Sequence, residues 1–208
     1  MARSAGAVRP VHDRVQPVQP LGQEGRLAVD LRGALGAFAA VAATHRLIDR
    51  ARPPARRRRK IGGEDHAIGC SRGGLSTKIN ARVDGRGLPV RIVLLPGQAS
   101  DKAAVAALIE GMSGGADLVG DRGYDARAVL DLVEAAGGQA HIPTCRDRKV
   151  QRSVDPELYR HRNLVERFFN KLKHFRRIAT RYEKTASNFL AAVLIASTRL
   201  WTRFESTT

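Results

Sequence analysis

The sequence is short of cysteine, of long apolar runs and of acidic residues, and each shortage excludes a class of protein. Cys70 and Cys145 are its only cysteines, too few for a disulfide framework or a cysteine zinc site, which fits a reducing cytosol. The most apolar run, residues 33–43, is about eleven residues long and cannot cross a bilayer. Acidic and proline-rich sequence precedes it, unlike a signal peptide. We therefore expect a cytoplasmic protein with no membrane role.

The shortage of acidic residues makes the chain strongly basic. Only 20 Asp and Glu stand against 36 Lys and Arg, so the net charge is +16 over 208 residues. This charge favours a polyanionic partner, most simply nucleic acid. Residues 1–60 carry 13 of the cations and five of the nine prolines, and they end in a basic run at 56–60. The length fits one domain with an appendage.

The most informative stretch is residues 159–173, which read YRHRNLVERFFNKLK. On an α-helix, Tyr159, Arg162, Glu166 and Lys173 fall within roughly 60° of one another. Apolar residues form a neighbouring stripe at positions 165, 168, 169, 172 and 175. The pattern predicts a helix that buries one side and presents a polar row at the edge of the core. An ordinary amphipathic helix with a solvated charged face is the alternative reading.

The spacing Y-x2-R-x3-E-x6-K resembles the signature around the catalytic glutamate of a large group of bacterial insertion-sequence DDE transposases. Four further segments resemble that family and follow in family order: residues 73–79, 94–101, 120–125 and 176–182. The resemblance covers about residues 61 to 203. It implies a ribonuclease-H-like α/β fold, a mixed sheet flanked by helices, with 61–208 as the catalytic domain.

The local patterns fit that order of elements. They predict a hairpin of strands 75–83 and 89–95 around a turn formed by Asp84, then a helix over 101–112 capped by Ser100. A short strand at 116–120 would deliver Asp121, and Asp125 would cap a helix ending near 136. A strand at 139–142, a basic loop at 143–155 and helices at about 157–181 and 187–203 complete the prediction.

The resemblance also implies a site and its chemistry. Asp121 would be the second acid and Glu166 the glutamate of a DDE triad, and both would bind Mg²⁺ or Mn²⁺ for DNA cleavage and strand transfer. Arg162 and Lys173 would hold DNA phosphates or orient Glu166, and Tyr159 would stack on the DNA end or form a hydrogen bond with it. Two plainer readings stay open, that Asp121 caps a turn and that Glu166 pairs with Arg162 or Asn170. The expected DNA-binding cations are Arg122, Lys171, Lys173, Arg176, Arg177 and Arg181.

Residues 1–60 do not match the family in the frame given. When residues 45–61 are back-translated with degenerate codons and the first base is discarded, the new frame permits I-D-S-S-I-V-R-A-H-Q-H, which resembles the strand carrying the family's first aspartate. Residues 15–28, treated likewise, permit a segment similar to the family's N-terminal helical DNA-binding segment. We therefore predict that residues 1–60 are out of frame and disordered or poorly folded, with the first strand missing or garbled. Asp49 lies about three residues from the place expected of the first acid.

These features predict a DNA transposase of an insertion sequence, as an inactive or partial copy. Its partners would be the transposon ends and the target DNA, and it would be nucleoid-associated in the cytoplasm. Whether it forms a homo-oligomer stays open. The alternative function is a non-catalytic basic DNA-binding protein that modulates a full-length transposase.

Overall fold

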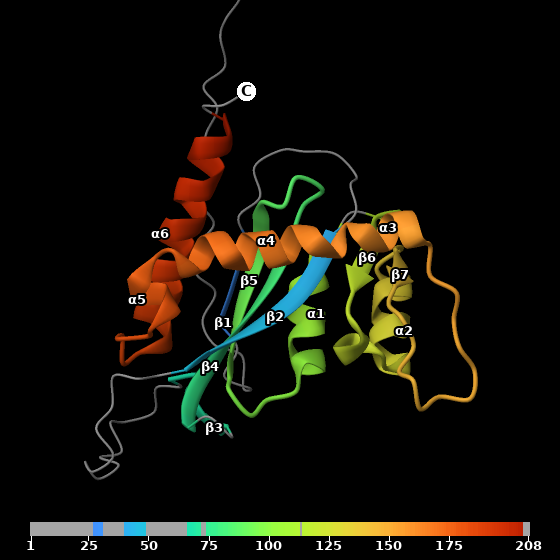
Figure 1. Cartoon of the computed structure of the whole chain (residues 1–208), viewed down its shortest axis with the longest axis horizontal. Coiled ribbons are helices and arrows are strands. Elements are labelled where there is room, and N and C mark those ends of the chain that lie inside the picture. Colours follow the sequence, from blue (N-terminus) through green and yellow to red (C-terminus); the bar gives the residue numbers. More distant parts are fainter. Residues whose placement is uncertain (1–26, 31–39, 49–65, 72–73, 113, 206–208) are drawn as a thin grey trace, which may run out of the picture.

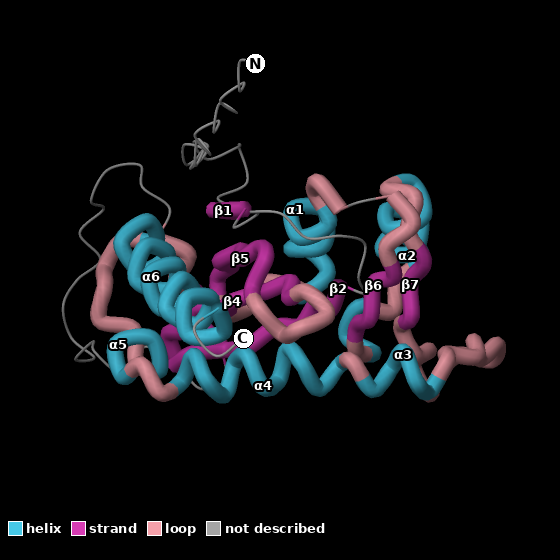
Figure 2. The backbone as a smooth tube through the Cα atoms, turned by 90° about the horizontal axis from the view of Figure 1, so that it is seen from above, coloured by secondary structure: helices cyan, strands magenta, loops and turns pink. Residues whose placement is uncertain are grey.

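A computed structural model describes residues 27–30, 40–48, 66–71, 74–112 and 114–205. Three layers make up this part of the chain, with the sheet in the middle (Figures 1 and 2). Helices α1 and α2 cover one face, and α3 to α6 cover the other. Within the described ranges, no helix is long and apolar enough to span a bilayer.

The sheet is mixed. Its strands are β1 (Leu27–Asp30), β2 (Ala40–Ile48), β3 (Gly69–Ser71), β4 (Gly74–Val83), β5 (Pro89–Pro96), β6 (Asp117–Gly120) and β7 (Gln139–His141). The order is β1-β5-β4-β2-β6-β7, and β3 pairs with β4. β2 is antiparallel to β4 and parallel to β6, which in turn is parallel to β7. The predicted hairpin is therefore β4 and β5, with the Asp84 carboxylate accepting the backbone N–H groups of Arg86 and Leu88 in the turn.

The helices differ from the prediction mainly at their ends. They are η1 (Asp101–Ala104), α1 (Val105–Ile109), η2 (Arg122–Tyr124), α2 (Arg127–Ala135), α3 (Pro156–Arg160), α4 (Arg162–Lys173), α5 (Arg176–Ala179) and α6 (Ala186–Glu205). The expected single helix over 157–181 is divided into α3, α4 and α5. The extended backbone of Phe175, with ψ of 100°, separates α4 from α5. Ser100 precedes η1 as predicted, but its hydroxyl makes no capping hydrogen bond.

The prediction was a first strand that is missing or garbled, and the structure shows that it is not missing. β2, from within residues 1–60, fills the centre of the sheet, and its register with β4 runs from Val41 opposite Val83 to Ile48 opposite Ser76. The physical reason is that β4 and β6 both leave backbone groups that need partners, and a nine-residue segment without proline can supply them. The basic run at 56–60 and Asp49 lie outside the described residues.

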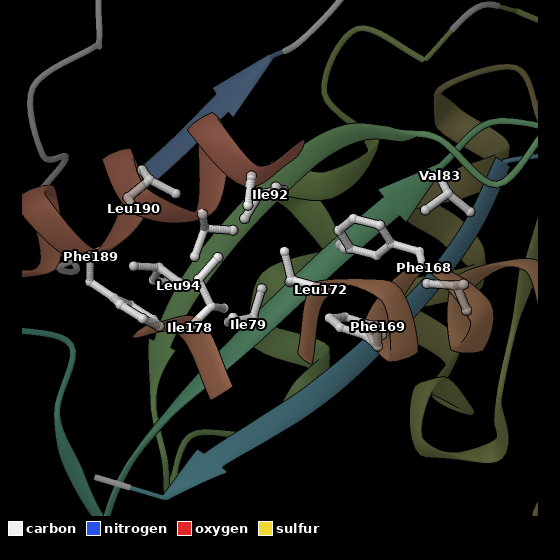
Figure 3. Close-up of a cluster of buried hydrophobic side chains, with 14 of the residues drawn as sticks. Ile79, Val83, Ile92, Leu94, Phe168, Phe169, Leu172, Ile178, Phe189 and Leu190 are labelled. Atoms are coloured by element: carbon white, nitrogen blue, oxygen red, sulfur yellow. The ribbon is translucent and has the colours of Figure 1, made fainter. Parts of the chain in front are cut away.

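Two cores follow from the alternation of side chains along β4 and β5. On one face, the side chains of Ile79, Val83, Ile92 and Leu94 pack against α4, α5 and α6 (Figure 3). The helices contribute to this core Val165, Phe168, Phe169, Leu172, Ile178, Phe189 and Leu190. On the other face, Val93 and Leu95 pack with residues of α1 and α2. The apolar stripe predicted for 165–172 is therefore the buried side of α4.

Candidate active site

Asp121 directly follows the buried strand β6. Its Oδ1 accepts the backbone N–H of Gly123 at 2.8 Å and so caps the short helix η2. The sequence prediction that a strand end delivers this acid is confirmed, and so is the plainer reading that it caps a turn. A capping carboxylate keeps a second oxygen, so the two roles are compatible.

A second acid, Asp101, borders the same turn. A Cβ atom built on Gly123 would lie 2.9 Å from Asp121 Oδ1 and 3.7 Å from Asp101 Oδ2. Lys78, buried on β4, places its Nζ 2.6 Å from Asp101 Oδ1 and 2.6 Å from the carbonyl oxygen of Ala99. This lysine offsets the charge of one of two neighbouring carboxylates. Lys78 and Asp101 lie in the family-like segments 73–79 and 94–101, but the sequence pattern alone indicates no role for either.

The polar row of residues 159–173 forms as predicted at three of its four positions. Arg162 Nη2 lies 2.8 Å from Glu166 Oε1, and the Arg162 guanidinium stands 6.0 Å from the centre of the Tyr159 ring. The pair is half-buried to exposed, so its net contribution to stability is about 0.3–0.5 kcal/mol, as for other i,i+4 pairs. Lys173 is exposed about two turns further along α4. Arg162 thus already holds Glu166 in one orientation.

The position of Leu164 shows which side of α4 carries this polar row. Atoms of Leu164 would stand 3.4 to 3.6 Å from a Cβ on Gly87, so this residue faces the β4–β5 turn. Glu166 lies about 160° from Leu164 around the helix, on the opposite flank. α3 contacts β6, and α4 contacts β2 and β4. α3 and α4 therefore cross β6 and its neighbour β2, and Glu166 is on the flank of α4 away from the β4–β5 turn.

The register of β2 determines which residue stands beside Asp121. Ala42 is opposite Gly120 in the parallel pair β2–β6, so Ala43 lies level with Asp121. No residue of β2 is acidic. Ile48, the last residue of β2, is about 17 Å further along the strand. Asp49 follows it, outside the described residues.

The donor chemistry of this region suits a hard divalent cation. Mg²⁺ prefers oxygen ligands and binds proteins through one or two carboxylates, completing its shell with water and substrate phosphate. One oxygen of Asp121 is bonded to Gly123 N–H and one of Glu166 to Arg162, which leaves a further oxygen on each carboxylate. Within the part of the chain that the structure describes, no three His, Cys, Asp or Glu residues form a metal-binding group.

Most of the cations expected to bind DNA are on the surface. Exposed side chains are those of Arg122, Lys171, Lys173, Arg176 and Arg177. Arg181 is different, because it is only 1 % exposed. Its guanidinium donates to the carbonyl oxygens of His66, Glu183 and Lys184 at 2.7 to 3.2 Å and lies over the Phe189 ring. The expectation that Arg181 contacts DNA is therefore wrong, since a guanidinium so enclosed cannot reach a phosphate.

Asp125 also departs from its expected role. Ala126, not Asp125, precedes the first turn of α2, and Asp125 is buried. Burial alone would raise the pKa of its carboxyl. Hydrogen bonds from the backbone N–H of Cys145 and from Arg152, with the charge of Arg152, outweigh burial and lower the pKa to about 2. Asp125 is thus a buried anion that holds the segment following β7.

Comparisons with known proteins show the family of this chain. Residues 42–201 match the family described as "Transposase DDE domain". The chain belongs to this DDE transposase family. It is also 36 % identical over 130 residues to a protein of Brucella ovis named "Putative transposase for insertion sequence element IS6501", an alignment that covers 62 % of this chain and all of that protein.

A solved structure of piggyBac transposase in a synaptic complex with hairpin DNA is a more distant likeness. The match has a TM-score of 0.41 and 10 % identity over 55 % of this chain, and the chain spans 24 % of the length of that structure. At that score the likeness adds nothing to the assignment. The family match itself spans β2 to α6 and so includes Asp121 and the whole polar row.

Proposed function

We propose that this DDE transposase is of the insertion-sequence kind and acts by metal-dependent cleavage and strand transfer at transposon ends. The observation that carries the proposal is the linked row Tyr159–Arg162–Glu166, on helices that contact the strands next to Asp121. The strand order β5-β4-β2-β6-β7, with an antiparallel half and a parallel half, supports a ribonuclease-H-like sheet. The catalytic domain would be residues 61–208, completed by β2.

In this proposal, Asp121 and Glu166 would hold Mg²⁺ or Mn²⁺. The bound ion would supply an activated water or 3′-hydroxyl and would stabilise the leaving oxygen. Arg162 keeps the Glu166 carboxylate oriented, and Tyr159 contacts the DNA end. Lys173, with the exposed cations Arg122, Lys171, Arg176 and Arg177, would bind phosphates and offset the repulsion between DNA and the acids. A nucleoid-associated location follows from such binding.

We also propose that the chain is an inactive or partial copy. β2 offers no acid, neither at Ala43, which is level with Asp121, nor at Arg46, where the other reading frame permits aspartate. Out-of-frame translation of residues 1–60 would explain why β2 lacks the first aspartate. The same observation favours the second candidate function, a non-catalytic DNA-binding protein that modulates a full-length transposase. Self-association with such a relative, or with a second copy, belongs to this proposal.

A cleavage assay separates the two candidates. The full chain is incubated with DNA that bears the element's ends, with Mg²⁺, with Mn²⁺ or with chelator. The inactive-copy proposal expects binding without cleavage under all three conditions. Metal-dependent cleavage that Asp121→Ala and Glu166→Ala both abolish would show an active enzyme. Absence of DNA binding would remove both candidates.

A further inference from the structure

The connection between β7 and α3, residues 143–155, forms a basic loop of defined shape. It carries four cationic side chains, those of Arg146, Arg148, Lys149 and Arg152. Arg146, Arg148 and Lys149 are exposed. In Figure 1 this orange segment runs outside α2 and β7 on its way to α3. Its cations are not among those that the proposed function uses.

Hydrogen bonds within the basic loop fix its shape. The backbone N–H of Arg148 donates to the carbonyl oxygen of Cys145 at 3.1 Å, and that of Arg152 donates to Thr144 Oγ1 at 2.9 Å. Gln151 Nε2 donates to the carbonyl oxygens of Cys145 and Arg148 at 3.2 and 2.7 Å. A loop ordered in this way loses little conformational entropy on binding, so its exposed cations are preorganised for a ligand.

The buried carboxylate of Asp125 anchors the basic loop. Asp125 Oδ2 accepts the N–H of Cys145 at 2.8 Å and lies 3.0 Å from Arg148 Nε, while Oδ1 lies 2.5 Å from Arg152 Nη2. Two guanidinium groups thus meet one anion, and their side chains remain 48 % and 34 % exposed. The loop also holds the exposed carboxylates of Asp147 and Asp155, so its four cations against these two and Asp125 leave a net charge of +1.

The base of the basic loop lies on the turn that contains Asp121. Cys145 Sγ donates to the carbonyl oxygen of Arg122 at 3.5 Å, and Arg122 directly follows Asp121. Any DNA that approaches Asp121 must overcome repulsion from carboxylates, and nearby cations reduce that repulsion. The loop supplies such cations beside the turn.

We propose that the basic loop is a further DNA-contact surface, on which Arg146 and Lys149 bind backbone phosphates of duplex DNA beside the Asp121 turn. Asp125 is a positioning residue that holds the loop in this shape. The inference rests on the proposed function for its ligand, but it concerns residues which that function does not use. The contacts are to phosphates, so they position the DNA without reading its sequence.

The first test measures binding of the full chain to a non-specific duplex over a range of salt. Arg146→Gln with Lys149→Gln should weaken binding about tenfold at low salt and lower the salt slope by about 1.8, at 0.9 per phosphate contact. The matched control is Lys184→Gln with Arg199→Gln, which removes the same charge from exposed positions elsewhere. The control should change affinity less than threefold and leave the slope unchanged.

The outcomes separate this inference from the proposed function. If the unaltered chain does not bind duplex DNA, the proposed function fails and the inference fails with it. If the chain binds and the loop pair behaves like the control pair, the inference alone is overturned. It is also overturned if the loop pair weakens binding to duplex RNA of equal length and not to DNA.

The second test concerns Asp125. Asp125→Asn makes the protein more positive, so long-range electrostatics alone would strengthen DNA binding. The positioning role predicts the opposite, binding three- to tenfold weaker, with no further loss when Arg146→Gln is added. Tighter binding, or an undiminished effect of Arg146→Gln, would remove the positioning role. If Asp125→Asn does not fold, the loop pair and its control decide the inference.

Discussion

At the scale of single residues, Arg181 shows how burial decides the role of a cation. Its guanidinium donates to the carbonyl oxygen of His66, to those of Glu183 and Lys184 in the connection between α5 and α6, and to Thr77 Oγ1. We expect Arg181→Ala to lower the free energy of unfolding by about 3 kcal/mol or more, because several buried acceptors lose their donor. Exposed Arg177→Ala is the control and should cost less than about 0.5 kcal/mol. Urea unfolding of both variants measures the difference, and equal midpoints would contradict the structural role.

Asp125 gives a residue-scale prediction that depends on pH. Its folded-state pKa of about 2 is below the ordinary value of 3.8, so its contribution to stability is complete above that value and is lost as pH falls toward 2. Asp125→Asn should lower the free energy of unfolding by about 2–3 kcal/mol at pH 7. The difference from the unaltered chain should shrink below about pH 4. Unfolding curves at pH 7, 4 and 3 measure this, with exposed Asp131→Asn as control. A difference that does not change with pH would contradict the ion-pair account.

At the scale of elements, the register of β2 suggests a substitution that tests whether this strand borders a metal site. Ala43→Asp would place a carboxylate level with Asp121, and without metal it should destabilise the chain by adding a like charge there. Binding of Mg²⁺ at ten times its dissociation constant should then restore on the order of 1 kcal/mol. The control is Leu47→Asp, four residues along the strand. Thermal unfolding with and without Mg²⁺ measures the effect, and an equal Mg²⁺ response of both variants would show that β2 does not border the site.

At the scale of elements, part of the fold could be predicted from the sequence. The β4–β5 hairpin, the strand ending at Asp121 and the buried stripe of α4 follow from local periodicity and turn chemistry, and the structure confirms them. β2 was not predicted, because the demand for a central strand comes from β4 and β6 and not from the Ala-rich segment itself. Arg181 and Asp125 were misassigned for a related reason. Their surroundings come from residues distant in sequence, and charge alone does not reveal burial.

At the scale of the whole molecule, the net charge of +16 predicts salt-dependent DNA binding with little sequence preference. If the exposed cations Arg122, Lys171, Lys173, Arg176 and Arg177, together with Arg146 and Lys149 of the basic loop, each bind one phosphate, the slope of log affinity against log salt should be about −6. Titrations of end-bearing and unrelated duplexes between 50 and 200 mM salt, about the range over which such contacts weaken, measure both quantities. Tight, salt-insensitive binding to one inverted repeat would contradict this prediction.

The central claim is that Asp121 and Glu166 belong to a transposase site that lacks only its first acid. The most direct measurement compares Mg²⁺-dependent nicking of end-bearing DNA by the chain as given and by a chain with the other frame restored over residues 15–61. We predict no nicking by the first and nicking by the second, abolished there by Asp121→Ala or Glu166→Ala. Nicking by the unrepaired chain that depends on the same two residues would contradict the claim, as would a restored chain that folds and nicks without them.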